Sequence, residues 1–286
     1  MILHRDIIKI AEIQGVPKST VDKDWVLGHF IDALFSIEEL RTVLIFKGGT
    51  ALRKCWFENY RFSEDLDFTC INPDFVLTGE HLKAVCELLW NCIELPTHIE
   101  SLRELRHKDS KMGYEANIRF WGADHSRNEN PPVAERWQTK IKIEITTHEL
   151  MVFQPVQKVI SHPYPDSLSA DAQVTCYSLE EVVAEKLRAL IQRSYTAPRD
   201  FYDLWYILSK YPGLNTVVIR QAFLDKLAFK GYAFTGIEQL VNPGNSKTVS
   251  KAWSASIGHQ IRKSDLPTFE EVSTFLQGRI AEILVR

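Results

Sequence analysis

Hydrophobic residues recur at helical spacing in several stretches of the chain. Near the N-terminus, apolar side chains three and four positions apart predict amphipathic helices over residues 4–14, 20–38 and 79–93. The same spacing returns after residue 178 and predicts a series of helices over residues 179–194, 199–210, 216–228 and 268–284. The C-terminal part of the chain is therefore expected to be helical.

Strand patterns are confined to the N-terminal part. Residues 41–46 and 66–71 are short apolar runs rich in β-branched or aromatic side chains, which is typical of buried strands. Residues 114–122 and 140–146 alternate strictly and are separated by a long polar loop with two prolines, which predicts a pair of strands. A helix is expected between the first two strands, over residues 50–57.

The proline-rich stretch 155–173 is the best candidate for a linker or boundary, because it carries three prolines between the two kinds of pattern. We therefore predict an α+β domain over residues 1–160, with a mixed sheet and the N-terminal helices, and a helical domain over residues 174–286. Ligand sites are common where two domains meet, so a cleft between them is the expected location of a site.

Composition narrows the class of protein. Of 286 residues, 45% are hydrophobic and 25% are charged, as in soluble globular proteins, and no run approaches the roughly 20 apolar residues of a membrane span. The five cysteines are odd in number and include no CxxC, which favours reduced thiols and a cytoplasmic protein. A net charge of −3 restricts any nucleic-acid binding to a local basic patch.

Two carboxylates alternate with apolar residues in the second predicted strand. Asp65 and Asp67 point to one face of that strand, while Leu66 and Phe68 face the core. Like charges so close together favour a bridging cation, and Mg²⁺ binds one or two carboxylates together with phosphate oxygens. The alternative is an exposed strand edge with two solvated acids.

A third carboxylate occurs in residues 140–146 (KIKIEIT). The three isoleucines face one way, and Glu144 faces the other way with Lys140, Lys142 and Thr146. If this strand lies beside the Asp65–Asp67 strand, Glu144 completes a metal site or deprotonates an attacking hydroxyl. The alternative is the solvated face of an antiparallel sheet.

Glycines follow the first predicted strand. Gly48 and Gly49 stand between this strand and a helix, with Thr50 or Gly49 near the N-cap, so backbone N–H groups can approach an oxyanion there. The sequence matches neither a Walker A motif nor G-x-G-x-x-G. A tight strand-to-helix connection without a ligand explains the glycines equally well.

Lys186 lies on the apolar stripe of its predicted helix, which begins with the capping box Ser178-x-x-Glu181. Such a lysine either extends to the edge of the buried surface or has an anionic partner, for example a triphosphate. Asp200 and Asp203 begin the next helix, where they complement the helix dipole, pair with Lys186 or Arg199, or orient a substrate.

Residues 242–264 contain no acid. They carry Lys247, Lys251, Arg262 and Lys263 around Trp253 and His259, which is compatible with phosphate-backbone contacts and equally with a solvated basic face.

Four sequence blocks follow one another along the chain: FKGGTAL (46–52), RFSEDLDF (61–68), SLEEVVAEKLRAL (178–190) and PRDFYDLWYIL (198–208). In this order they resemble the AbiEii-type nucleotidyltransferases, which are the toxins of AbiE-like type IV toxin–antitoxin and phage abortive-infection systems, and the similar MenT toxins. The resemblance covers about residues 40–210.

The resemblance implies a nucleotidyltransferase fold of the DNA polymerase β superfamily. Gly48 and Gly49 match the turn that holds the triphosphate, and Asp65 and Asp67 match the metal-binding D-x-D motif. Glu144 is the best match to the third carboxylate. Many superfamily members have serine where this chain has Gly49, so a hydroxyl contact to phosphate has to come from Thr50 or is absent.

Further downstream, Lys186 matches a lysine that contacts the nucleotide and Asp200 matches the acid of the final motif, with Asp203 close behind. The implied reaction transfers a nucleoside monophosphate from an NTP to an acceptor, with two Mg²⁺ (or Mn²⁺) ions on the three carboxylates. Lys47 and Lys186 would help the glycine turn to hold the phosphates.

The MenT resemblance implies a tRNA 3′ end as the acceptor, and the AbiE resemblance implies a winged-helix, AbiEi-like antitoxin as a partner. A protein acceptor, including the toxin itself, stays open. Two other functions share part of the pattern: a D-x-D glycosyltransferase, which does not explain the glycine turn or Lys186, and a non-catalytic nucleotide- or RNA-binding module.

Overall fold

The computed structural model describes residues 2–284 except 126–129, 194–196 and 241–242. The chain divides into two compact units, and each is described by itself. The first contains Met1–Glu149 and Pro155–Cys176, and the second contains Leu150–Gln154 and Tyr177–Arg286.

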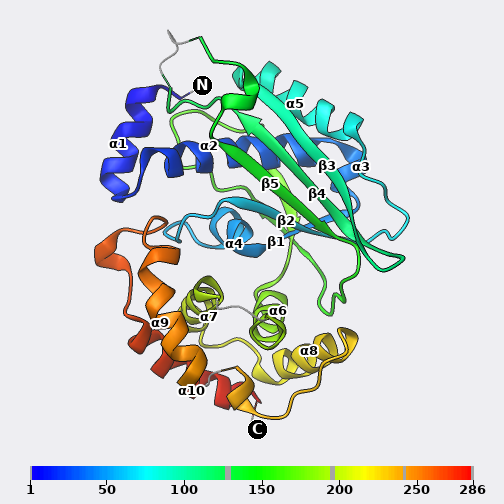
Figure 1. Ribbon diagram of the computed structural model, residues 1–286, viewed down its shortest axis with the longest axis vertical. Helices are drawn as coiled ribbons and strands as arrows, with labels where there is room; N and C mark the ends of the chain where they lie inside the picture. The colour runs from blue at the N-terminus through cyan, green and yellow to red at the C-terminus, as the bar shows by residue number, and fades with distance from the viewer. Residues whose placement is uncertain (1, 126–129, 194–196, 241–242, 285–286) are drawn as a thin grey trace. The chain divides into compact units, whose positions relative to one another are not determined.

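A mixed seven-stranded sheet forms the centre of the first unit, among the residues that the structure describes (Figure 1). The strand order is β3-β4-β5-β2-β1-β7-β6, and neighbours are antiparallel except for the parallel pairs β2/β5 and β1/β7. The strands are β1 (Leu44–Lys47), β2 (Asp65–Cys70), β3 (Thr97–His107), β4 (Ser110–Phe120), β5 (Lys140–Thr146), β6 (Val156–Val159) and β7 (Gln173–Cys176).

Helices α2 (Lys18–Ser36) and α5 (Gly79–Ile93) pack against this sheet, and Figure 1 shows α2 crossing behind the strands. Helix α1 (His4–Gln14) packs on α2, and α3 (Glu38–Arg41) contacts α2 and β1. The packed face is apolar because every second residue of the central strands points to it: Phe68 of β2, for example, pairs with Ile145 of β5 and contacts the ring of Phe35 on α2. The charged residues between these positions therefore point to the opposite face.

The predicted α+β fold is confirmed, and α1, α5 and β5 have the predicted bounds. Strand β3 was not predicted, because its sequence THIESLRELRH lacks clear alternation and most of its side chains are only partly buried or exposed. Strands β6 and β7 have four residues each, too few to show a pattern. The helix expected over residues 50–57 begins earlier, as α4 (Gly48–Ala51), and continues as a π-helical turn, η1 (Leu52–Trp56).

The proline-rich segment expected as a linker is part of the first unit. Between β6 and β7 it crosses α2, where the Tyr164 hydroxyl donates to the Asp24 carboxylate (2.7 Å) and Ser169 donates to Asp32 through its amide (2.9 Å) and hydroxyl (2.6 Å). Pro155 stands where the chain returns to the first unit, immediately before β6, and Pro163 and Pro165 lie in the connection between β6 and β7.

The described part of the second unit is helical, as predicted, and contains one helix that was not predicted, α9. Its long helices are α6 (Leu179–Gln192), α7 (Pro198–Lys210), α8 (Thr216–Phe229), α9 (Pro243–Ile257) and α10 (Phe269–Leu284). The 3-10 turns are η3 (Ile237–Gln239) and η4 (Lys263–Asp265), and the first unit has one more, η2 (Ala134–Arg136). No helix in the described residues is both long enough and apolar enough to cross a bilayer.

Trp253 belongs to the core of the second unit. Its ring lies 5.3 Å from that of Phe269, and its Nε1 donates to the carbonyl of Pro267. The basic residues around it in the sequence are exposed, so this region presents charge without Trp253 as a stacking surface.

Glu181 has a different role from the one its capping box predicts. Ser178 accepts a hydrogen bond from the Glu181 amide, as expected of an N-cap, but the Glu181 carboxylate accepts from the amides of Val152 and Phe153. It also pairs with the buried Lys226 at 2.5 Å. These contacts are the reason that Leu150–Gln154 belongs to the second unit.

Candidate active site

Three of the predicted site residues lie side by side across the centre of the sheet. Asp67 on β2 pairs in register with Lys47 on the antiparallel strand β1 and with Glu144 on the parallel strand β5. Residues in register share a face, and this face is the one opposite the α2–α5 layer. Asp65 lies two residues before Asp67 on the same face, in register with Lys142.

Lys142 is the immediate partner of Glu144. Its Nζ lies 2.9 Å from Glu144 Oε2 and 3.2 Å from Glu115 Oε2 on β4, and Arg103 on β3 contacts the other oxygen of Glu115 at 2.6 Å. Burial disfavours the charged form of Lys142, but its hydrogen bonds to the two glutamates hold its pKa well above the ordinary value. The carboxylates on this face are thus arranged among cations.

Gly48 brings the backbone of the turn against Asp67. It has a φ of +80°, which favours glycine, and a Cβ at this position would lie 2.3 Å from Asp67 Oδ2. No side chain can be placed there without moving the carboxylate. The first turn of α4 follows at once, and helix N-termini carry N–H groups without intrahelical acceptors. The predicted phosphate turn and the D-x-D strand are therefore in direct contact.

Gly49 faces a cation and a hydroxyl that the sequence did not reveal. A Cβ on Gly49 would lie 2.7 Å from Arg61 Nη2 and 2.9 Å from Ser63 Oγ. Thr50, in contrast, is fully buried, and its hydroxyl donates to the carbonyl of Asp65 (2.5 Å). Thr50 thus ties the turn to β2, and Ser63 is the hydroxyl beside Gly49.

Two basic residues after the turn are held away from solvent. Arg53 and Lys54 pair with the fully buried Asp24 of α2 at 2.7 and 2.8 Å. Although burial opposes ionisation, these two cations hold the pKa of Asp24 well below its ordinary value. The network anchors the π-helical turn to α2 and so fixes the end of the glycine turn.

Lys186 forms a buried cluster with two acids in the second unit. Its Nζ lies 2.9 Å from Asp200 Oδ1 and 2.6 Å from Asp203 Oδ2, and Arg193 contacts the other oxygen of Asp200. Burial lowers the pKa of Lys186, but the charges of the aspartates outweigh it, so the pKa is raised. Of the partners that the sequence allowed for Lys186, the described contacts are with both Asp200 and Asp203.

Sequence analysis missed four residues of the sheet face and the turn: Lys142, Glu115, Arg61 and Ser63. Lys142 had a visible signal, since it is two residues before Glu144 and shares its face. The other three had none, because their positions depend on strand register and on the path of the chain between η1 and β2.

Comparison with known proteins decides the family. The model of the family described as "Nucleotidyl transferase AbiEii toxin, Type IV TA system" matches residues 29–274. The chain belongs to the AbiEii family. It is accordingly an NTP-dependent nucleotidyltransferase of the toxin class, and the family implies a divalent metal ion and an antitoxin partner.

Solved structures show the same fold at low sequence identity. MenT4, a nucleotidyltransferase toxin from Mycobacterium tuberculosis H37Rv, superposes with a TM-score of 0.59 at 18% identity, over 100% of this chain and 99% of that one. JHP933 from Helicobacter pylori superposes with a TM-score of 0.57 at 16% identity, over 94% of this chain and 93% of that one. No curated protein sequence matches the chain.

The donors on the sheet face of this AbiEii toxin suit the metal that the family implies. Asp65, Asp67 and Glu144 offer carboxylate oxygens, the ligand type that Mg²⁺ and Mn²⁺ prefer. The adjacent Gly48 leaves space beside Asp67 that a Cβ would fill.

Proposed function

We propose that this AbiEii toxin transfers a nucleoside monophosphate from an NTP to the 3′ end of a tRNA, with Mg²⁺ as the preferred metal. The observation that carries the proposal is the contact between the Gly48 backbone and the Asp67 carboxylate, with Glu144 in register beside it. Phosphate and carboxylates can share so small a space only when a cation lies between them. The fold that the chain shares with MenT4, a nucleotidyltransferase toxin, supports the same reaction class.

The glycine turn is proposed to hold the β and γ phosphates. Gly48 and Gly49 allow the backbone to approach the oxyanions closely, and the N–H groups at the start of α4 donate to them. Lys47, at the end of β1, and Arg61, beside Gly49, add positive charge. Ser63 is proposed to supply the hydroxyl contact that Gly49 cannot make.

The three carboxylates are proposed to act on the reacting groups. Asp65, Asp67 and Glu144 would hold a divalent metal ion, which would supply charge neutralisation at the transferred phosphate and activation of the acceptor hydroxyl. The acceptor hydroxyl releases its proton to solvent as its oxygen forms a bond to the α phosphorus, the bond from that phosphorus to the bridging oxygen breaks, and pyrophosphate leaves. Lys142 is proposed to keep Glu144 oriented between turnovers.

Lys186 is proposed to contact the nucleotide phosphates, with Asp200 and Asp203 as positioning residues. Both acids lie within 3 Å of its Nζ and are themselves buried, so they fix the direction of the ammonium group. A lysine held in this way loses little conformational entropy when a phosphate binds.

The exposed basic residues of the second unit are proposed to contact the tRNA backbone. Lys247, Lys251, Arg262 and Lys263 are all exposed. Contacts of this kind give affinity without reading sequence and weaken with salt. The antitoxin partner is proposed to be a winged-helix, AbiEi-like protein.

A transfer assay tests the proposal. The purified protein is incubated with each of the four α-labelled NTPs, Mg²⁺ and total tRNA, and labelled RNA is separated from labelled protein. We expect one or more NTPs to label tRNA, and Asp67→Asn to reduce labelling about a hundredfold or more. Asp74→Asn, an exposed aspartate in the loop after β2, is the matched control and should keep full activity.

Periodate-oxidised tRNA identifies the acceptor atom, because it lacks the 3′-terminal hydroxyls. Loss of labelling on oxidised tRNA supports transfer to the 3′ end. Label on the protein alone would contradict the tRNA acceptor and favour self-modification. Equal labelling by the wild type and Asp67→Asn would refute the assignment of the site.

A further inference from the structure

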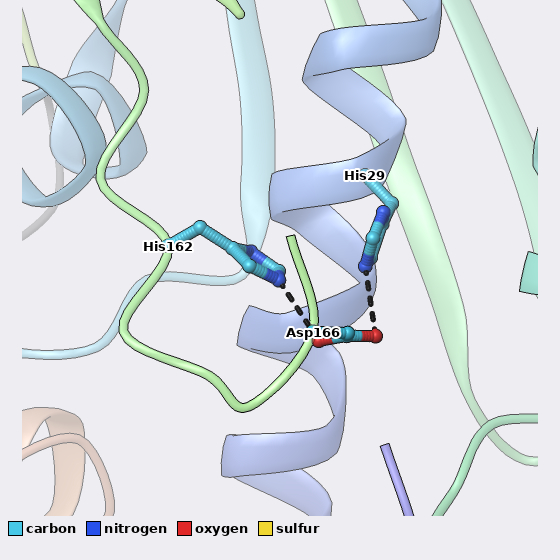
Figure 2. A group of neighbouring side chains, drawn as sticks. All are labelled: His29, His162 and Asp166. Atoms are coloured by element: carbon cyan, nitrogen blue, oxygen red, sulfur yellow. Dashed lines mark hydrogen bonds and ion pairs between the residues drawn. The ribbon is translucent and has the colours of Figure 1, made fainter. Parts of the chain in front are cut away.

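A second cluster of possible metal ligands lies in the first unit and shares no residue with the transfer site. His29 on α2 and His162 and Asp166 on the segment between β6 and β7 point toward one another (Figure 2). The three possible ligand atoms all lie within 4.8 Å of one another, and this is the one such group among the residues that the structure describes. None of the three is used in the proposed transfer.

The two contacts between the imidazoles and Asp166 have the spacing of neighbouring ligands in a tetrahedral site. His29 Nε2 lies 3.4 Å from Asp166 Oδ2, and His162 Nε2 lies 3.2 Å from Asp166 Oδ1. Zinc binds nitrogen and oxygen at 2.0–2.2 Å, so two ligands of a tetrahedral ion are roughly 3.3–3.6 Å apart. Two imidazoles and one carboxylate are a known ligand type for zinc, with the fourth position left to water.

The contact of His29 within this cluster is long for a hydrogen bond. His29 is 5% exposed, and its Nε2 lies 3.4 Å from Asp166 Oδ2 without meeting the geometry of a well-formed hydrogen bond. A buried imidazole that is weakly bonded in this way gains from a metal ion that takes its lone pair.

A neighbouring side chain orients the carboxylate of this cluster. Trp25 Nε1 lies 3.1 Å from each Asp166 oxygen and orients the carboxylate, as outer-shell partners of metal ligands do.

Gly28 leaves space on α2 for the side chain of His162. Gly28 lies in the middle of α2, and a Cβ there would lie 2.5 Å from His162 Nδ1. Glycine is less favourable than alanine in the interior of a helix. At this position, the absence of a Cβ leaves space for the His162 imidazole ring. The ring then lies 4.6 Å from that of His29, centroid to centroid.

We propose that His29, His162 and Asp166 bind one divalent transition-metal ion, best matched by Zn²⁺, which fastens the segment between β6 and β7 to α2. The ion would join a long helix to a connection without regular secondary structure. The inference is independent of the proposed transfer, so either can fail alone.

Metal titration of the Asp65→Asn/Asp67→Asn variant tests this site, because the variant lacks the aspartate ligands of the transfer site. After treatment with a chelator, Zn²⁺ binding is followed by calorimetry, and Co²⁺ binding by the strong visible absorption of tetrahedral Co²⁺. We expect one ion per chain and a raised melting temperature. Adding His162→Gln or Asp166→Asn should weaken Zn²⁺ binding roughly tenfold or more.

Gly28→Ala added to the same background distinguishes coordination from general damage, because it keeps all three ligands, suits a helix and displaces only the His162 ring. It should also lose the tetrahedral Co²⁺ spectrum, whereas His107→Gln, at an exposed position on β3, should keep it. Circular dichroism checks that each variant is folded. Absence of the Co²⁺ spectrum from the parent protein, or its survival in folded His162→Gln, would overturn the proposal.

Discussion

Asp67 on β2 and Glu144 on β5 lie directly opposite each other on adjacent parallel strands, although they are far apart in the chain. The same register places Leu66 beside Ile143 and Phe68 beside Ile145 on the apolar face. A slip of one residue would turn the carboxylates into the core, so burial of the isoleucines fixes the site.

Gly48→Ala should abolish nucleotide transfer. The new Cβ would lie 2.3 Å from Asp67 Oδ2, and alanine at a φ of +80° costs about 1–2 kcal/mol of folding free energy. We expect at least a hundredfold loss of activity in the labelling assay with a modest fall in melting temperature. Gly79→Ala, where a Cβ meets no atom within 4 Å, is the control. Full activity of Gly48→Ala would show that the turn does not depend on this close contact.

Exchanging Gly49 and Ser63 tests whether a hydroxyl beside the turn contacts the bound NTP. Gly49→Ser would place its Cβ 2.7 Å from Arg61 Nη2 and 2.9 Å from Ser63 Oγ, so we expect weaker NTP binding. The double variant Gly49→Ser/Ser63→Gly removes one clash and restores one hydroxyl. NTP affinity, measured by calorimetry, should recover in the double variant beyond Ser63→Gly alone. If NTP affinity does not recover, the remaining clash between the new side chain and Arg61 is responsible for the weaker binding.

Lys142→Met should lower the metal concentration needed for activity. Lys142 competes for the Glu144 carboxylate at 2.9 Å, and both side chains are more than a third exposed, so the pair contributes only about 0.2–1 kcal/mol. We expect a shift of about two- to fivefold in half-maximal Mg²⁺. Lys140→Met, on the same strand and paired with Glu100, is the control. A higher Mg²⁺ requirement would instead show that Lys142 helps to assemble the site.

Asp22→Asn should stabilise the protein at alkaline pH. Asp22 is 1% exposed, and burial, with the nearby Asp124, raises its pKa to about 7 from an ordinary 3.8. The folded state then holds a proton that the unfolded state releases, so stability falls as the pH rises from about 4 to 7. The penalty at pH 8 is on the order of a few kcal/mol.

The measurement for Asp22 is the melting temperature of both proteins at pH 5 and pH 8. Asparagine cannot ionise, so the gain over wild type should be larger at pH 8 than at pH 5. Asp225→Asn, in the second unit, should show no such difference. An equal gain at both pH values would contradict the raised pKa.

Lys186→Met should destabilise the second unit and weaken NTP binding. It removes the cation that lies 2.6 Å from the fully buried Asp203, and breaking a buried pair in this way costs about 3–5 kcal/mol. The double variant Lys186→Met/Asp203→Asn should regain part of the unfolding free energy, because the buried negative charge is removed together with the lysine. If Lys186 also contacts phosphate, NTP affinity should stay low in the double variant. Recovery of both would limit Lys186 to a structural role.

Much of the fold was readable from the sequence. Helix and strand periods depend on the residues within each element, which is why α1, α5 and β5 were predicted to the residue. The face of each central strand was also predictable, since alternation places Asp65, Asp67 and Glu144 opposite the apolar side chains. The order of the four blocks was enough for the family, which the match over residues 29–274 confirmed.

Only the tertiary structure decided which faces of the strands, helices and loops lie against one another. Strand register placed Glu144 beside Asp67, and Lys142 beside Glu115. Chain packing put Arg61 and Ser63 beside Gly49, and brought His162 to Gly28. These contacts join residues distant in sequence, and no local period encodes them. The sequence determined which side chains each element presents, and long-range burial of apolar surface decided their neighbours.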